Sequence, residues 1–419
     1  MNSMINRLMS LSAAATVLAA CGNAPQRANT PITDYLYGVE YDDYDFEAGT
    51  KALEHYKPAA AGCSEVRKGD FVGRNLDWYI NHDASAVIKV NSSEKRYASI
   101  GVVGCCTRFD DAFAESGEYG EIYGLLPMFT VDGINEKGLY VGVNVMPTGE
   151  TSPDPEKWNS GSWGLGAAFT NPASDKTFCV TYLVRVLLDN ASSVAEAKEL
   201  VRSINWFEPY GFPHEGESQS FHWLISDPDE SAVLEFIENE PYFNENPGIC
   251  EPGFGTIMTN FTNKLMADGL MQISGAGYER WDTLAAAYGQ ADESFEGMQN
   301  LMKKAWYTQF YTNDPTAPEH FMTEVASQKH PASVLYHNPE YRNSEEWAEI
   351  AAGLKKDYAN PENWHSSDSP LWYTTHTSVY RISTRELHVI LHEGLDEQKD
   401  FLAFSLADSH FAKPLEMSE

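Results

Sequence analysis

Short stretches in which apolar residues alternate with small or polar ones recur between residues 63 and 406. This period of two predicts β-strands, because successive side chains of a strand point to opposite faces. The strongest case is a hairpin at residues 221–237, where an Asp-Pro-Asp-Glu turn separates two apolar runs. Strands are predicted at 71–72, 85–90, 98–104, 139–145, 221–226, 232–237, 256–260, 374–382, 387–391 and 401–406.

Apolar residues spaced three and four apart predict helices at 178–188, 194–203, 278–288, 295–305 and 345–358. Ser192 and Ser193 offer an N-cap to the second of them. Strands, then helices, then strands again favour a layered α+β domain over alternating βαβ units. The chain has no internal repeat and no clear second domain. Residues 311–341 are rich in Pro and His and are predicted to form a surface insertion.

The first residues have the pattern of an export signal. A weakly basic start at residues 2–7 is followed by an apolar stretch at 8–20, which is too short to span a bilayer. It ends in Leu-Ala-Ala-Cys-Gly at residues 18–22 and so resembles a bacterial lipoprotein signal, with Cys21 as the lipidated residue. The alternative is an ordinary secretory signal with an incidental cysteine. Residues 1–21 are therefore predicted to be a signal peptide, and the protein to be anchored to the cell envelope by lipid.

Residues 22–62 are polar and acidic and have no sustained period. We expect a tether or pro-segment there, followed by one catalytic domain at 63–419. The whole chain has 61 acidic and 29 basic residues and a formal net charge of −32. A nucleic-acid partner is therefore excluded, because phosphate binding needs a basic surface.

Six cysteines divide into three groups. Cys21 is assigned to lipid and Cys63 to chemistry. The remaining four are Cys105, Cys106, Cys179 and Cys250. They lack the Cys-x-x-Cys spacing of a zinc site, and whether they form disulfides or remain buried thiols stays open. Neither a metal nor an organic cofactor is expected.

The chain around Cys63 has the layout of a nucleophile at the start of a strand. A short apolar run and a Lys-Gly-Asp turn at 68–70 follow it, and then Gly-Arg-Asn-Leu-Asp-Trp at 73–78. A hairpin here would fold Arg74 and Asp77 back beside the sulfur. If the chain is cut before Cys63, the new α-amine, with a pKa of about 7.7–8.0, can act as the base.

These residues resemble the choloylglycine hydrolase family of linear amide C–N hydrolases, which includes bile salt hydrolases and penicillin V acylases. The resemblance extends along the chain in family order. Its further segments are Tyr-Val-Gly-Val-Asn at 140–144, the hairpin at 221–236, Thr-Asn at 259–260, Tyr-Glu-Arg at 278–280 and the strands within 374–391. It implies the N-terminal-nucleophile fold, an αββα sandwich in which two antiparallel sheets lie between helix layers.

The resemblance also implies a role for each site residue. Cys63 would attack a small-molecule acyl amide, and Arg74 would favour the thiolate. Asp77 would orient the α-amine. Asn144 and Asn260 would donate to the oxyanion, and Arg280 would add positive charge or orient Asp77. An acyl-enzyme would form, the amine would leave, and water would complete the hydrolysis.

Several alternatives remain open. Residues 22–62 precede Cys63, so exposing its amine requires an internal cut after Gly62, unlike in many bacterial members of the family. A Cys–His dyad with His214, His222 or His376 is a competing mechanism. The aromatic loop at 158–163 is either an acyl pocket wall or a simple lid.

The sequence also leaves the substrate open. Conjugated bile acids, penicillin V-like compounds and N-acyl amino acids share one bond type. The resemblance makes a homo-oligomer an option. The competing function is a lipid-anchored binding or surface protein that keeps the scaffold without catalysis.

Overall fold

The computed structural model describes residues 26–31, 36–47, 50, 62–79, 85–103, 126–146, 169–207, 220–249, 251–269, 276–306, 308–310, 371–391 and 400–408. Several predicted features lie outside these residues: the insertion at 311–341, the helix at 345–358, the loop at 158–163, His214, and Cys21, Cys105, Cys106 and Cys250. None of the helices in the described ranges is long and apolar enough to cross a membrane.

In the described part of the chain, nine strands form one sheet. Their order is β1 (Gln26–Pro31), β2 (Leu36–Tyr41), β5 (Ser85–Val90), β6 (Ser99–Val103), β7 (Thr130–Asn135), β8 (Tyr140–Met146), β11 (Ser220–Ser226), β12 (Ser231–Ile237) and β13 (Glu240–Glu245). All neighbours are antiparallel except β2 and β5, which are parallel.

A second sheet is antiparallel throughout and contains seven described strands. Its order is β14 (Ile257–Met258), β3 (Gly62–Lys68), β4 (Phe71–Tyr79), β16 (Leu371–Arg381), β17 (Glu386–Leu391) and β18 (Leu402–Ser405), and β15 (Thr308–Phe310) also pairs with β16. The hairpin that begins at Cys63 thus lies next to the long C-terminal strand β16.

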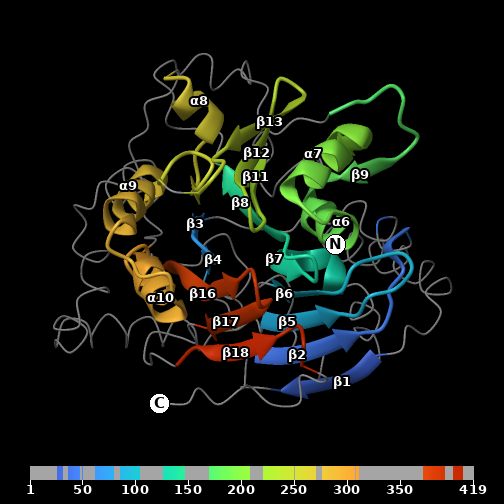
Figure 1. Ribbon diagram of the computed structural model, residues 1–419, viewed down its shortest axis with the longest axis horizontal. Helices are drawn as coiled ribbons and strands as arrows, with labels where there is room; N and C mark the ends of the chain where they lie inside the picture. Colours follow the sequence, from blue (N-terminus) through green and yellow to red (C-terminus); the bar gives the residue numbers. More distant parts are fainter. Residues whose placement is uncertain are drawn as a thin grey trace, which may run out of the picture.

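Helices cover the outer faces of both sheets (Figure 1). The nine-stranded sheet packs against α6 (Leu183–Asn190) and α7 (Val194–Ser203), and the seven-stranded sheet against α9 (Ala276–Tyr288) and α10 (Phe295–Lys303). Ser193 and Ser294 cap α7 and α10 by accepting backbone N–H bonds. Shorter elements are η1 (Leu126–Phe129), η2 (Val180–Tyr182), α8 (Asn263–Ala267) and the parallel pair β9 (Thr177–Cys179) and β10 (Asn205–Phe207).

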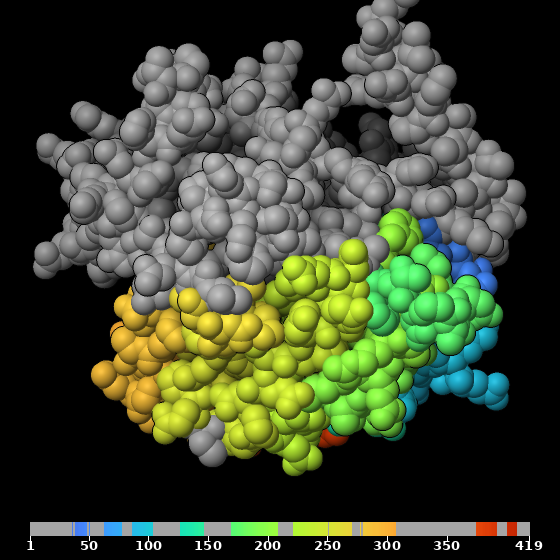
Figure 2. Space-filling model, turned by 90° about the horizontal axis from the view of Figure 1, so that it is seen from above, coloured from blue at the N-terminus to red at the C-terminus, as the bar shows by residue number. Residues whose placement is uncertain are grey.

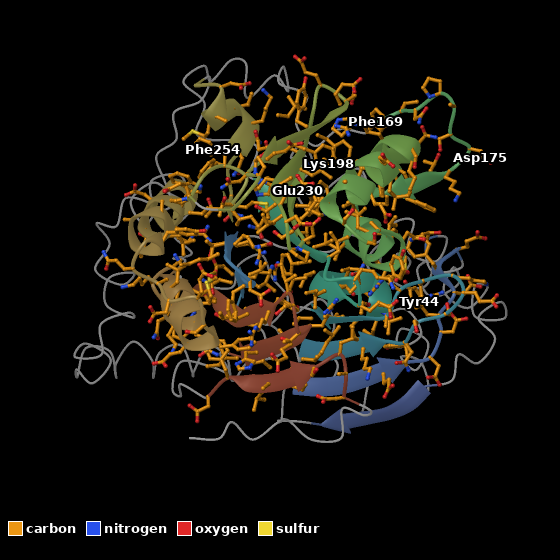
Figure 3. The ribbon with its side chains drawn as sticks, in the orientation of Figure 1. Tyr44, Phe169, Asp175, Lys198, Glu230 and Phe254 are labelled. Carbon is orange, nitrogen blue, oxygen red and sulfur yellow. The ribbon has the colours of Figure 1, made fainter. Side chains whose placement is uncertain are left out.

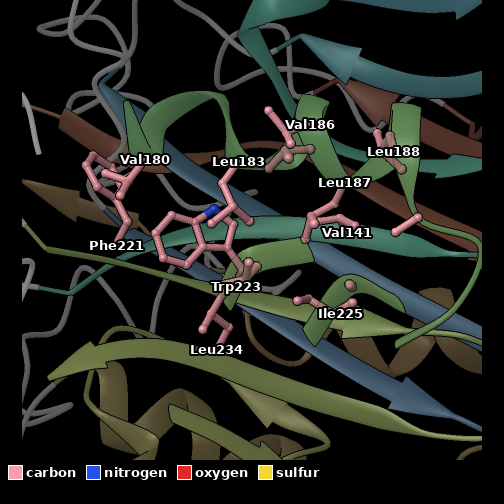
Figure 4. Packing of buried hydrophobic residues seen from close by; sticks show 14 of the residues in the cluster. Val141, Val180, Leu183, Val186, Leu187, Leu188, Phe221, Trp223, Ile225 and Leu234 are labelled. Carbon is pink, nitrogen blue, oxygen red and sulfur yellow. The ribbon is translucent and has the colours of Figure 1, made fainter. Parts of the chain in front are cut away.

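Buried apolar side chains fill three separate layers. Between the sheets lie residues such as Val72, Ile100 and Leu224. Under α6, Trp223 packs with Leu183 and neighbouring aliphatic side chains (Figure 4). A third cluster joins the seven-stranded sheet to α9 and α10. Helices, sheet, sheet and helices therefore follow one another, which confirms the predicted αββα sandwich.

Figure 2 shows how successive parts of the chain are arranged on one face of the molecule. Residues 276–306 lie at one end, residues 169–207 towards the other, and residues 220–249 and 251–269 between them. Segments that follow one another in the sequence thus form neighbouring parts of this surface.

Most predicted elements lie where the pattern placed them, and two of the differences have a physical reason in the structure. The helix predicted at 178–188 begins only at Leu183, because 177–179 pair with β10 and 180–182 form a 3-10 turn. Strands β7 and β13 and helix α8 were not predicted. β13 alternates intermediate and exposed residues and offers few apolar positions.

The segment 22–62, expected to be a tether or pro-segment, contains two strands. Within it, β1 and β2 belong to the nine-stranded sheet, and the apolar side chains of Leu36, Val39 and Tyr41 are buried. The acidic residues around them hide this strand in the sequence, because three buried apolar side chains are enough for a short strand whose backbone pairs on both sides.

Candidate active site

The β3–β4 hairpin brings the first candidate residues together. Its turn contains Gly69 with φ +51°, a left-handed conformation that glycine adopts without strain. The register pairs Gly62 with Asp77 and Glu65 with Arg74. Because side chains alternate along β3, Cys63 and Glu65 point to the same face. Cys63 is fully buried there.

Arg74 is the residue that approaches the sulfur most directly. Its Nη2 lies 3.6 Å from Cys63 Sγ and donates to the carbonyl of Val143 at 2.9 Å. The Val143 bond fixes the guanidinium between the two sheets, since β8 belongs to the nine-stranded sheet. A permanent positive charge is thus held within reach of the thiol.

The other guanidinium nitrogens of Arg74 face two carboxylates and an imidazole. Nε lies 3.4 Å from Glu65 Oε1, and Nη1 lies 3.4 Å from Asp132 Oδ1 and 3.3 Å from His376 Nε2. All four side chains are completely buried. We call Arg74, Glu65, Asp132 and His376 the Arg74 cluster. Apart from Arg74, sequence reasoning had named only His376, as an alternative base.

Hydroxyl groups complete this cluster. Tyr140 donates to Glu65 Oε2 at 3.0 Å. Asp132 Oδ2 accepts from Ser378 at 2.5 Å and from Tyr380 at 2.8 Å. The carboxylates are thus hydrogen-bonded on both oxygens, as buried charges require.

The pKa values show which acids carry charge. Burial raises the pKa of Glu65 to about 8, although Arg74 opposes the shift. Burial also acts to raise the pKa of Asp132, but Arg74, His376 and Ser378 together hold it below its usual value. Burial keeps the pKa of His376 low, so the imidazole is neutral near pH 7. At that pH Arg74 therefore faces one ionised acid, Asp132, and one protonated acid, Glu65.

A second arginine contacts the backbone of Cys63. Arg280, from α9, donates through Nη1 to the carbonyl of Cys63 at 2.8 Å and to Asp77 Oδ2, and through Nη2 to Asn260 Oδ1. Asp77 Oδ1 also accepts from Thr374 at 2.6 Å. We call Arg280, Asp77 and Asn260 the Arg280 cluster. It joins three predicted site residues to Cys63.

Asn260 also holds the nitrogen of Cys63. Its Oδ1 accepts from Cys63 N at 2.9 Å, and its Nδ2 donates to the carbonyl of Val145 at 2.6 Å. An amide nitrogen has two hydrogens, so the second hydrogen of Nδ2 is available for an oxyanion.

Asn144 lies between two residues that contact the site, since the Val143 carbonyl accepts from Arg74 and the Val145 carbonyl accepts from Asn260. Asn144 Nδ2 is 3.4 Å and 3.3 Å from the carbonyls of Met258 and Thr259, the two residues before Asn260. Its Oδ1 is buried and has no hydrogen-bond partner among the described residues, and no hydrogen bond joins it to Cys63 there. The structure thus places Asn144 as a support of the segment that carries Asn260.

The state of the Cys63 thiol follows from its surroundings. Burial raises its pKa to about 12; Arg74 opposes this, while Asp77 and Glu65 add to it. The thiol is therefore protonated near pH 7 in the intact chain. Burial likewise raises the pKa of Asp77, against the effect of Arg280. In the intact chain the nitrogen of Cys63 is an amide, and so no base is yet in place beside the sulfur.

The two described histidines that had been considered as bases do not hydrogen-bond the sulfur in the part of the chain that is described. His222 Nε2 lies 2.7 Å from the Thr259 carbonyl, and its Nδ1 lies 3.2 Å from Glu235. Glu235 in turn accepts from the first backbone N–H groups of α8. His222 thus supports the segment before Asn260, and His376 contacts Arg74. The geometry gives the Cys–His dyad no support.

Gly142 allows β8 to pass close above Glu65. A Cβ at this position would lie 2.4 Å from Glu65 Oε2 and 2.5 Å from the Tyr140 hydroxyl. Any side chain at 142 would therefore displace the Arg74 cluster. A cavity of about 990 Å³ lies at a different place, between Tyr44 and α6, and no predicted site residue lines it.

Comparison with known proteins agrees with the resemblance. The family model of the linear amide C–N hydrolases, choloylglycine hydrolase family, matches residues 64–265, slightly less than half of the chain. This match confirms the expected resemblance. It begins one residue after Cys63 and ends before Arg280, and so it covers Arg74, Asp77, Asn144 and Asn260. None of the curated proteins matches the chain.

Solved structures give weaker similarity. A mutant of the conjugated bile acid hydrolase from Clostridium perfringens is 15% identical, with a TM-score of 0.39, over 85% of this chain and 97% of the other. The penicillin V acylase from Agrobacterium tumefaciens is 12% identical, with a TM-score of 0.34, over 82% of this chain and 86% of the other.

Proposed function

We propose that this chain, which resembles the linear amide C–N hydrolases, hydrolyses the amide bond of a small N-acyl compound with Cys63 as an N-terminal nucleophile. The observation that supports this most is the set of three polar contacts of Cys63. Arg74 Nη2 lies 3.6 Å from its sulfur, and Asn260 and Arg280 bond its nitrogen and its carbonyl. A structural cysteine needs none of these polar contacts.

The first reaction is the cut between Gly62 and Cys63. The Cys63 sulfur adds to the Gly62 carbonyl carbon, the peptide C–N bond breaks, and the thiol proton passes to the departing nitrogen. A thioester of Gly62 on Cys63 remains. Water hydrolyses it to the Gly62 carboxylate and the free thiol, leaving Cys63 with an α-amine. Arg74 favours the sulfur anion during the attack.

The freed amine then serves as base for turnover. Its ordinary pKa of about 7.7–8.0 suits proton transfer near neutrality. Asn260 Oδ1 already accepts from this nitrogen, so the amine is held beside the sulfur by the same contact. The thiolate attacks the substrate carbonyl, and Asn260 Nδ2 donates its second hydrogen to the oxyanion. The protonated amine gives its proton to the leaving nitrogen, and water then releases the acid.

The substrate is an N-acyl amide. The bile acid hydrolase and penicillin V acylase named above suggest conjugated bile acids and penicillin V-like compounds, and N-acyl amino acids share the bond. The net charge of −32 slows the approach of strongly anionic compounds. We therefore rank neutral acyl amides first. A substrate panel with mass-spectrometric detection of the released amine tests the ranking.

The protein is proposed to be exported and anchored by lipid on Cys21. Replacing Cys21 by Ala should move the protein from the membrane fraction to the soluble fraction. An unchanged distribution between the fractions would contradict the anchor.

The decisive experiment combines intact mass, N-terminal sequencing and amide turnover. Cys63→Ala should abolish both the cut and turnover. Cys179→Ala is the matched control, since Cys179 is also a buried cysteine but contacts Thr181 instead of the site. Protein that stays uncut and inert, yet binds acyl amides equally well with Cys63→Ala, would favour the lipid-anchored binding protein instead.

A further inference from the structure

We infer that the N-terminal segment stays bound after the cut, so that the mature protein consists of two chains and keeps its lipid anchor through the smaller one. This rests on the proposed cut between Gly62 and Cys63. The segment in question comprises β1, β2 and residues 42–47, which we call the N-terminal strap.

The strap is joined to the sheet by backbone pairing. Strand β2 pairs with β5 over its full length, from Leu36 with Ser85 to Tyr41 with Val90. The pairing continues at Asn91, whose backbone N–H donates to the Tyr41 carbonyl at 2.8 Å. On its other side β2 pairs with β1. Its removal would leave β5 as an unpaired edge strand.

The strap also contributes to the core. Leu36 belongs to the apolar layer between the sheets, where Val87 and Val102 are its neighbours in the cluster. Val39, Tyr41 and Tyr44 belong to the cluster that contains Ile88 and Tyr182, beside α6. These four strap side chains are at most 3% exposed. Loss of the strap would open both clusters to water.

Polar contacts of Asp43 and Tyr44 hold the end of the strap, and we call them the polar lock. The hydroxyl of Tyr44 donates to Asp189 of α6, and Arg185 donates to the same carboxylate at 2.9 Å. Arg96 donates to the Tyr44 carbonyl at 2.8 Å, pairs with Asp43 at 2.8 Å, and lies over the Tyr44 ring. Figure 3 shows Tyr44 beside the ends of the sheet strands, below α6.

The cut leaves these contacts in place. All of them are made by residues 36–47 and by residues after 84, and the cut lies between these two groups. Two acidic residues of the strap are held by the large fragment as well, since Asn91 Nδ2 donates to Glu40 and Asp42, both at 2.9 Å. A third, Asp43, pairs with Arg96. Activation of Cys63 and release from the membrane are then separate events.

The test uses the full-length processed protein. Native size-exclusion chromatography should give one peak that contains both fragments, and denaturing electrophoresis should separate them. Membrane fractions should contain the large fragment, and 2 M salt should not release it. A folded, active large fragment that elutes without the small one would overturn the inference.

A second protein separates this inference from the proposed function. Cys63→Ala, with a site-specific protease sequence inserted between residues 50 and 62, is cut by added protease without any chemistry at Cys63. If the strap still co-elutes, the inference about the strap holds even where self-cutting fails. If the strap separates here, the inference is wrong even where the enzyme processes itself.

Two strap variants and one control show how much individual side chains contribute to binding of the strap. Tyr44→Phe removes the hydroxyl bond to Asp189 and should speed dissociation of a labelled strap about fivefold to tenfold, the loss of one buried hydrogen bond. Val39→Asp places a charge in the apolar cluster and should release the strap or prevent folding. Glu47→Gln changes an exposed side chain and should leave dissociation unchanged. Equal rates for Tyr44→Phe and Glu47→Gln would contradict the lock.

Discussion

Two arginines reach Cys63, and they differ in what surrounds them. Arg74 contacts the sulfur, and one carboxylate, one protonated carboxylic acid and a neutral imidazole surround it in a fully buried position. Arg280 touches the backbone carbonyl of Cys63 and retains slight exposure, with a carboxylate and an amide as its partners. Arg74 therefore contacts the side chain of Cys63, whereas Arg280 contacts its backbone.

The difference suggests a division of labour. Removing Arg74 leaves ionised Asp132 without its main positive partner in the buried interior. We therefore expect the free energy of unfolding to fall. Arg280 fixes three atoms at once, on Cys63, Asp77 and Asn260. A change that keeps its charge but loses its geometry should therefore affect the reaction more than the fold. The following predictions test this contrast.

The largest effect is expected for Arg74→Met. The side chain has similar length, but Asp132 loses its buried counter-charge. The free energy of unfolding should fall by about 3–5 kcal/mol. Denaturant titration in a Cys63→Ala background measures this, because all proteins compared then remain uncut. A loss below about 1 kcal/mol would mean that the Arg74 cluster is not held by charge.

Arg280→Lys should mainly slow catalysis. Lysine keeps the positive charge near Asp77, but a single ammonium cannot reproduce the fork that holds Asn260 and the Cys63 carbonyl. A misplacement near 1 Å lowers kcat about 100-fold. The free energy of unfolding should change by no more than about 1 kcal/mol. Steady-state kinetics and denaturation of the same protein give both values, and the reverse pattern would invert the proposed division.

Glu65→Gln should reveal a pH-dependent cost within the Arg74 cluster. The pKa of Glu65 is raised to about 8 by burial, against about 4.3 in an unfolded chain. The stability that this shift contributes is complete below pH 4.3 and is lost as the pH rises towards 8. The variant should therefore gain stability relative to the natural protein between pH 6 and pH 9, on the order of 2 kcal/mol. Melting temperatures measured against pH for Cys63→Ala with and without Glu65→Gln test this. A difference between the two proteins that does not change with pH would refute the prediction.

The smallest effect is expected for Arg381→Gln, which supplies the baseline for both arginines. Arg381 pairs with Asp70 at 3.0 Å, but its side chain is 43% exposed. Such surface pairs contribute about 0–1 kcal/mol and are screened by salt. Denaturation at low and high salt should show a small difference that salt removes, and kcat should not change.

Part of the site could be predicted from the sequence because it is local. Cys63, Arg74 and Asp77 belong to one hairpin, and strand register places them. The same logic would have placed Glu65, two residues after Cys63 on the same face and opposite Arg74. The sequence therefore contains a signal for Glu65 in the alternation and pairing of the two strands.

The rest of the site depends on packing between distant segments. Asp132 and His376 reach Arg74 from positions 58 and 302 residues along the chain, and no local pattern encodes these contacts. Asn260 and Arg280 could be placed only by resemblance. Asn144 was expected at the oxyanion, and the structure directs its amide towards the carbonyls before Asn260 instead.

The structure of the N-terminal strap could not be predicted from its composition. Its acidic composition suggested a tether, yet Asp43 pairs with Arg96, and Glu40 and Asp42 share Asn91. Composition counts charges but does not show whether they have partners. The segment forms a strand of the sheet because apolar residues such as Leu36 and Val39 are buried in it.

The parallel pairing of β2 with β5 has a consequence for the life of the mature protein. Parallel neighbours need a crossover connection, and here that connection contains the β3–β4 hairpin of the other sheet. If the chain is cut after Gly62 as proposed, the crossover is severed, and refolding changes from a unimolecular to a bimolecular process. At cellular dilution, a mature molecule that unfolds cannot recover its partner quickly. Its survival would then be set by its unfolding rate alone, and the intact precursor would be the only form that folds repeatedly.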